Sequence, residues 1–356
     1  MLNNVDLIEN FFFPYKKQEL DSTEERNKIK TYDFCCLNEI RISEKIKKNI
    51  PNYQKYFDIL TDYSNIKLTA STHVFSEEDL EKYDEYDILS EKHVLINYTD
   101  QLRVDLYSFL LNLPTPKLFV FHVIDSYSHL SKSFSRLNAN NICFFNLCAE
   151  KIVVDVTTLK PLLHDFEYSL YTRNLNEDYL CKIVDKMSDF TNMPLEIHVI
   201  FYLIKNNENT LSYSIISEIC DSFVKNMGVL SIFSQIYRDN LKLSCIESLK
   251  KYINRSKTEI INDIMTFSKT WDNYGLSVMF LHIVGNMSRV FSLKDNFITK
   301  FSILLSKNIN PFPSKREELH ETMNKYSELF NEYPDWSFIS KIPDEKLEIL
   351  IEKLIC

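Results

Sequence analysis

The sequence predicts an α+β protein in which a few strands come early and helices make up most of the rest. Three short runs rich in β-branched or aromatic residues are typical of strands: residues 56–60, residues 93–97 and the Ile-Val-Val-Asp-Val run after Lys151. Several longer segments repeat apolar residues every three or four positions, which is typical of amphipathic helices. At 356 residues, the chain is long enough to bury a substantial core in one large domain or two small ones.

The first helix is predicted from residue 38 to residue 50. Ile42, Ile46 and Ile50 fall on one face of this segment, and Pro51 marks its end. The helix is therefore expected to bury one apolar face.

The strands at 56–60 and 93–97 flank an acidic stretch, residues 76–86, which we expect to form a solvated loop. After the second strand, apolar periodicity predicts helices over residues 104–113 and 117–137. Further helical segments are predicted at residues 214–237, 241–253 and 259–267.

Composition and charge exclude several classes of function. A net charge of -9 argues against general nucleic-acid binding, which needs a basic surface. No apolar run reaches the roughly 20 residues of a membrane span, and no basic-then-apolar leader opens the chain. The eight scattered cysteines include no C-x-x-C pair and read as reduced core residues rather than zinc ligands or disulfides. We therefore expect a cytoplasmic protein without a nucleic-acid or membrane partner.

Residues 140–166 carry the most informative pattern in the chain. They read NNICFFNLCAEKIVVDVTTLKPLLHDF: a turn, a loop, a β-branched run and then an Asp-Phe pair. This order resembles the catalytic loop and the metal-binding loop of eukaryotic-type protein kinases. In that resemblance Phe144 stands at the kinase His, Asn146 at the catalytic Asp and Lys151 at the metal-binding Asn. Asp165 and Phe166, followed by Glu167, stand where Asp-Phe-Gly would be.

Other kinase landmarks follow in the right order. Glu39 is similar to the Glu of the kinase regulatory helix, and Asn97 would open the hinge. Residues 193–196 (MPLE) resemble the A-P-E element, and Glu196 would pair with Arg316 of a D-P-x-x-R-like element. Asp272 opens a D-N-Y-G-L-S segment similar to the start of the central large-lobe helix, where it would accept backbone N–H bonds from the catalytic loop.

The resemblance implies a two-lobed fold with a reduced small lobe and a mostly helical large lobe. The small lobe would span residues 1–97 and the large lobe residues 98–340, followed by a C-terminal helix over residues 341–356. Residues 197–271 have no kinase counterpart of that length. They are either extra packing on the large lobe or a docking surface for a protein partner.

The residues at the expected reactive positions are poorly suited to phosphoryl transfer. Asn146 can bind a hydroxyl but cannot take its proton, and Lys151 would repel magnesium. No glycine precedes Gly228, so a glycine-rich phosphate loop is absent from the small lobe. The lysine that would form an ion pair with Glu39 is either Lys17 or Lys30, and the sequence does not decide between them.

Asp165 is the one competent metal ligand, so the resemblance implies ATP as a cofactor with weakened magnesium binding. If the resemblance is set aside, the alternative interpretation is that Asp165 is a turn residue and Glu39 is a carboxylate on the surface of a helix. Phe144 and Phe166 would keep a packed aromatic core.

Three functions remain open. The first is a pseudokinase that binds a protein partner, similar to kinase-like proteins of large DNA viruses, in which case it would lie in the host cytoplasm or the virion. The second is a divergent active serine/threonine kinase that uses Asp165 and one metal ion. The third is a helical interaction protein without a nucleotide site.

Overall fold

The structure is a computed structural model that describes residues 27–66, 93–98 and 103–355. Three predicted features lie wholly or partly outside these residues: Lys17, the acidic stretch 76–86 and the hinge that follows Asn97. The described chain is α+β and mostly helical, which confirms the predicted class.

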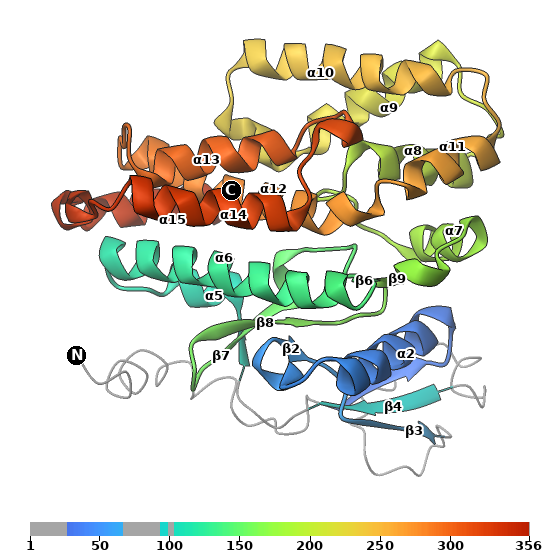
Figure 1. The fold of residues 1–356 in the computed structure, drawn as a ribbon, viewed down its shortest axis with the longest axis horizontal. Helices are drawn as coiled ribbons and strands as arrows, with labels where there is room; N and C mark the ends of the chain where they lie inside the picture. The colour runs from blue at the N-terminus through green and yellow to red at the C-terminus, as the bar shows by residue number, and fades with distance from the viewer. Residues whose placement is uncertain (1–26, 67–92, 99–102, 356) are drawn as a thin grey trace.

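A three-stranded antiparallel sheet lies at one end of the molecule, at the bottom of Figure 1. Its order is β1 (Asn27–Thr31), β4 (His93–Asn97) and β3 (Asp62–Ile66). Strand β4 covers the residues predicted for it. Helix α2 (Phe34–Asn49) starts earlier than expected, because the Asp33 carboxylate caps it by accepting from the Cys36 N–H at 2.9 Å.

Helix α2 buries two faces. Cys36 and Ile40 pack with Leu60 and Ile96 in a small core beside the three-stranded sheet. The predicted apolar face of α2 instead joins the main core, through Ile42, Ile46 and Ile50. The helix therefore connects the small sheet to the rest of the protein.

A second sheet lies between α2 and the helices. Its order is β2 (Phe57–Asp58), β8 (Lys160–His164), β7 (Ile152–Asp155) and β5 (Arg103–Asp105), with only the β2–β8 pair parallel. The predicted strand at 56–60 is thus reduced to two residues.

The helix predicted over 104–113 is partly wrong, because its first residues form β5 against β7. Helix α5 (Leu106–Leu111) begins only after Asp105, whose carboxylate accepts from the Ser108 N–H. A two-stranded ladder joins β6 (Ile142–Cys143) to β9 (Leu170–Tyr171).

Helix α12 (Trp271–Val290) runs through the centre of the helical body and is buried along almost its whole length. Helix α6 (Pro116–Ala139), predicted over 117–137, lies between it and the second sheet (Figure 1). Gly275 on α12 allows a close approach, because a Cβ there would lie 3.3 Å from the Leu147 Cβ. Around these helices lie α7 (Glu177–Lys186), α8 (Leu195–Lys205), α13 (Phe297–Asn308), α14 (Leu319–Glu332) and α15 (Glu345–Ile355).

The region 197–271 contributes helices at the end of the molecule opposite β3 and β4 (Figure 1). They are α9 (Tyr213–Asn226), α10 (Gln235–Leu249) and α11 (Lys257–Met265). The single helix predicted over 214–237 is wrong, because a 3₁₀ turn that starts at Gly228 separates α9 from α10. The predicted helices at 241–253 and 259–267 correspond to parts of α10 and α11.

Short 3₁₀ segments complete the description: Tyr53–Lys55, Ala149–Lys151, Thr172–Asn174, Gly228–Ile232, Lys250–Tyr252, Ser268–Thr270, Pro313–Lys315 and Ser337–Lys341. Across the described ranges, no helix combines the length and apolarity needed to cross a bilayer.

Candidate functional site

Lys30, at the end of β1, lies at the centre of a charged cluster. Its Nζ is 2.7 Å from Glu39 Oε2, 3.1 Å from Glu167 Oε2 and 3.5 Å from Asp165 Oδ1. Of the two lysines considered as the partner of Glu39, Lys30 therefore makes the contact, and Lys17 lies outside the described residues. We call Lys30, Glu39, Lys151, Asp165 and Glu167 the Lys30 cluster.

The pair of Lys30 and Glu39 is largely removed from water. Glu39 is buried on α2, and its second oxygen, Oε1, accepts from the Tyr98 hydroxyl at 2.7 Å. Burial alone would lower the pKa of Lys30, but Glu39 and the other carboxylates outweigh it and raise that pKa above its ordinary value. Burial and the Glu39 charge also raise the pKa of Tyr98. Lys30 is therefore a permanent cation and Tyr98 a neutral donor.

Asp165 follows β8 in a left-handed conformation with φ of 61°. Its Oδ1 faces Lys30, and its Oδ2 lies 3.6 Å from Lys151 Nζ. Lys151 is buried, and its Nζ also lies 4.4 Å from the centre of the Tyr168 ring, within the range of a cation–π contact. The carboxylate of Asp165 is thus neutralised from both sides by ammonium groups of the same chain.

The Lys30 cluster contains a set of oxygens that resembles a cation site. One carboxylate oxygen each from Glu39, Asp165 and Glu167 lies within 4.8 Å of the others. Lys30 contacts all three carboxylates, so a magnesium ion would have to displace an ammonium group already in place. Magnesium also demands near-octahedral oxygen coordination. This donor set therefore fits magnesium poorly.

Asn146 lies in the loop after β6 and is buried. Its N–H donates to the Phe144 carbonyl at 3.0 Å. Its side-chain amide makes no hydrogen bond with any residue in the part of the chain that the structure describes. The structure thus brings Lys151 to Asp165, but no hydrogen bond joins Asn146 to the Lys30 cluster.

Asp272, in the first turn of α12, holds the loop that carries Asn146. Its Oδ2 accepts from the Phe144 N–H at 3.1 Å, and its Oδ1 from the Phe145 N–H at 2.9 Å. The Cys143 thiol also lies 3.3 Å from Oδ1. Phe145 has a φ of 73°, a costly conformation for a bulky residue, and these bonds hold it there. Burial raises the pKa of Asp272 to about 6, although the two backbone bonds oppose the rise.

Aromatic rings connect the two loops. The Phe166 ring meets the Phe144 ring edge-on at 5.0 Å and the Phe57 ring at 6.0 Å. Phe144 also contacts Phe134 on α6 at 6.0 Å. Phe144 and Phe166 are buried, so both contribute to the packing expected of them.

Glu196 and Arg316 form the expected contact 120 residues apart. Arg316 Nη1 donates to Glu196 Oε1 at 2.8 Å and Nη2 to Oε2 at 2.6 Å. Trp271 Nε1 adds a third donor to Glu196 at 3.1 Å, and Arg316 Nε donates to the Asn310 carbonyl at 2.9 Å. Both side chains are buried, and the planar fork of Arg316 satisfies the carboxylate in a bidentate geometry.

Two residues of the site, Asn38 and Tyr98, were not predicted from the sequence. Asn38 Nδ2 donates to the carbonyls of Glu167 at 2.9 Å and Ser169 at 2.8 Å. Its Oδ1 accepts from the Tyr179 hydroxyl at 2.7 Å. Asn38 therefore fastens α2 to the segment after Asp165. The only sequence signal was a polar residue beside Glu39 on the buried side of a helix.

Asn97 is the last residue of β4. Its carbonyl accepts from the Thr61 N–H at 2.7 Å and the Thr61 hydroxyl at 3.0 Å. Its described contacts therefore close the three-stranded sheet and do not include the Lys30 cluster.

A scan against protein-family models gives no match for this chain, and a search of curated proteins gives none either.

Proposed function

We propose that this protein has a kinase-like, two-lobed fold and acts as a pseudokinase, a binding or scaffolding module with little or no phosphoryl transfer. Residues 1–97 would form the small lobe and residues 98–340 the large lobe, with 341–356 as a terminal helix. The observation that carries this proposal is the contact of Lys30 with both Glu39 and Asp165, close to a loop whose catalytic position holds the neutral Asn146.

Contacts between distant segments support kinase ancestry. A lysine on a strand pairs with a glutamate on the following helix and with the aspartate of an Asp-Phe pair. Asp272 on the central helix accepts from the backbone of the loop before Asn146. Glu196 pairs with Arg316. The roles of Asp272 and of the Glu196–Arg316 pair were expected from motif order, and a lysine partner for Glu39 was expected without being identified. The presence of these contacts favours a shared scaffold over chance resemblance.

The same residues argue against efficient catalysis. Asn146 cannot accept a proton, and the loss of a positioned base costs on the order of 10²–10⁴ in rate. Burial, with a hydrogen bond to Glu150, raises the pKa of Cys148 to about 12, so its thiol adds no charge to the loop. Glu167 replaces the flexible glycine of Asp-Phe-Gly and is held by Lys30 at 3.1 Å.

We further propose that any nucleotide binds without a strong need for magnesium. Lys30 and Lys151 already place two ammonium groups beside Asp165, where a kinase would use metal ions. These lysines would contact phosphate oxygens directly. The three carboxylates of the cluster also repel phosphate, so affinity for ATP is expected to be weak.

The test has two arms. In the first, titration calorimetry measures ATP binding to the purified protein with magnesium and with EDTA, and Lys151→Asn restores the oxygen donor of the kinase pattern. We expect similar weak binding in both buffers for the wild type and stronger magnesium dependence for Lys151→Asn. Wild-type binding that occurs only with magnesium would contradict the role given to the two lysines.

In the second arm, transfer from labelled ATP is measured for the wild type, Asp165→Ala and the control Asp178→Ala, which removes an exposed carboxylate on α7. We expect no transfer by any of them. Transfer that is lost only in Asp165→Ala would establish the alternative, an active kinase with one metal ion at Asp165. If ATP fails to bind in either buffer, a helical interaction protein without a nucleotide site is favoured.

A further inference from the structure

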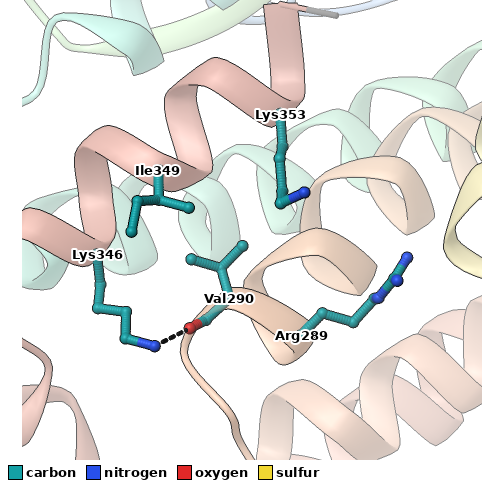
Figure 2. A pocket seen from close by; sticks show the side chains of 5 residues that line it. All are labelled: Arg289, Val290, Lys346, Ile349 and Lys353. Atoms are coloured by element: carbon teal, nitrogen blue, oxygen red, sulfur yellow. Dashed lines mark hydrogen bonds between the residues drawn. The ribbon is translucent and has the colours of Figure 1, made fainter.

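A second charged site lies at the C-terminal end of α12, whereas Asp272, which holds the loop before Asn146, lies at its N-terminal end. Arg289 and Val290 at the end of α12 and Lys346, Ile349 and Lys353 on α15 line an open cavity of about 300 Å³. Figure 2 shows the three basic side chains arranged around the two apolar ones. We call these five residues the basic pocket.

The charge of the basic pocket contrasts with that of the whole chain. Its lining carries three cations and no carboxylate, whereas the protein has a net charge of -9. Among residues 27–66, 93–98 and 103–355, no carboxylate forms an ion pair with Arg289, Lys346 or Lys353. The basic pocket therefore gathers three cations without a carboxylate partner among the described residues around one cavity, which makes it a candidate site for an external anion.

The bonds already made in the basic pocket leave donors free. Lys346 Nζ donates to the Val290 carbonyl at 2.8 Å, which satisfies one of the carbonyls exposed at the end of α12 (Figure 2). Arg289 Nη1 donates to the Ser231 carbonyl at 3.2 Å. Each of these cations uses one donor of three or five, and Lys353 makes no hydrogen bond with the described residues.

The apolar lining defines the ligand further. Ile349 lies between Lys346 and Lys353 on one face of α15, and 45% of this apolar residue is exposed. Residues 346, 349 and 353 follow the helical spacing that places side chains on one face. A ligand with a phosphate group on a carbon skeleton would satisfy both the cations and this apolar surface.

We propose that the basic pocket binds a phosphate group carried by a small molecule or by a phospholipid headgroup. Arg289 and Lys353 would bind the phosphate oxygens from two sides, while Lys346 holds the end of α12 and adds a third positive charge. Guanidinium and ammonium groups are the usual partners of phosphate in proteins. This proposal does not depend on the proposed kinase ancestry, because it uses none of the residues of the Lys30 cluster.

The test uses the full chain with inorganic phosphate and pyrophosphate, compared with potassium chloride at equal ionic strength. We expect pyrophosphate to bind in titration calorimetry and to raise the melting temperature of the wild type. The double variant Arg289→Gln/Lys353→Gln should bind at least about tenfold more weakly. Lys307→Gln, which removes an exposed lysine of α13, is the matched control and should bind like the wild type.

Two further arms separate the sources of the signal. Lys30→Met should leave pyrophosphate binding unchanged, whereas a loss of binding in this variant would place the anion at the Lys30 cluster and overturn the proposal. Sedimentation with phosphatidylcholine vesicles that contain phosphatidylinositol 4-phosphate, but not with pure phosphatidylcholine, would identify a lipid headgroup. Binding of soluble pyrophosphate alone would identify a small molecule. Equal binding by the wild type and the double variant, or no binding of any probe, would refute the proposal.

Discussion

Removing Arg316 tests how strongly the buried ion pair with Glu196 holds the helical body together. In Arg316→Met, the Trp271 N–H would be the one donor left to the Glu196 carboxylate among the described residues, since both bonds to the guanidinium disappear. Both side chains are buried, so little water can replace the lost donors. Breaking a buried pair by removing one partner typically costs about 3–5 kcal/mol.

The expected change in melting temperature follows from the size of the protein. Unfolding entropy is about 2.1 cal/mol/K per residue, or about 0.75 kcal/mol/K for this chain. A loss of about 4 kcal/mol should therefore lower the melting temperature by about 5 °C. Differential scanning calorimetry measures both the temperature and the enthalpy of the transition.

Two comparisons make this prediction specific. Lys315→Met removes an exposed positive charge one residue away and should change stability by no more than about 0.5 kcal/mol. Glu196→Leu combined with Arg316→Met removes both charges and should recover much of the loss. A loss below about 1 kcal/mol in Arg316→Met would refute the reasoning, as would a double variant whose cost equals the sum of the single costs.

Three other predictions concern the candidate site. Burial raises the pKa of Asp272 from 3.8 to about 6, so between these values the folded state keeps a proton that the unfolded chain releases. The contribution of Asp272 to the unfolding free energy should therefore fall by up to about 3 kcal/mol as pH rises through this window. Urea denaturation should show this contribution as the difference in pH dependence between the wild type and Asp272→Asn. In Lys30→Met, the three clustered carboxylates lose their central cation, so the variant should be less stable than the wild type. In thermal-shift assays, Mn²⁺ should restore stability to the variant and should not change that of the wild type. A variant as stable as the wild type would count against the cluster's role. Asn38→Ala removes three hydrogen bonds and should cost about 2–4 kcal/mol, with faster amide exchange in α2; protected amides there would show that α2 is held by other contacts.

Local sequence patterns predicted the elements whose residues determine their own conformation. The strand at His93–Asn97 and the helix over 117–137 were recognised from β-branched content and apolar periodicity. The segment 104–113 was misread because Val104 pairs with Val154, about fifty residues away, and this pairing cannot be seen in a local window. The break between α9 and α10 fell at Gly228, which the helical periodicity on either side obscured.

Motif order predicted contacts between residues that belong to the motifs, but it did not predict the residues outside the motifs that bind to them. The pairing of Glu196 with Arg316 and the acceptor role of Asp272 were expected from sequence and are present. The contributions of Asn38 and Tyr98 were not foreseen, because a single buried polar residue carries no pattern that distinguishes it from an ordinary helix or strand residue.

The sequence by itself determined which ionisable groups are available at the candidate site. Asn146 carries no ionisable group, whereas Lys151 and Glu167 supply an amine and a carboxylate in any fold. Only the tertiary structure decided which charges neutralise one another, with Lys30 placed against three carboxylates and Lys151 against Asp165. The physical reason is that electrostatic interaction depends on distance and burial. For Lys30 with Asp165 and Glu167, both are set by the packing of segments more than a hundred residues apart in the chain.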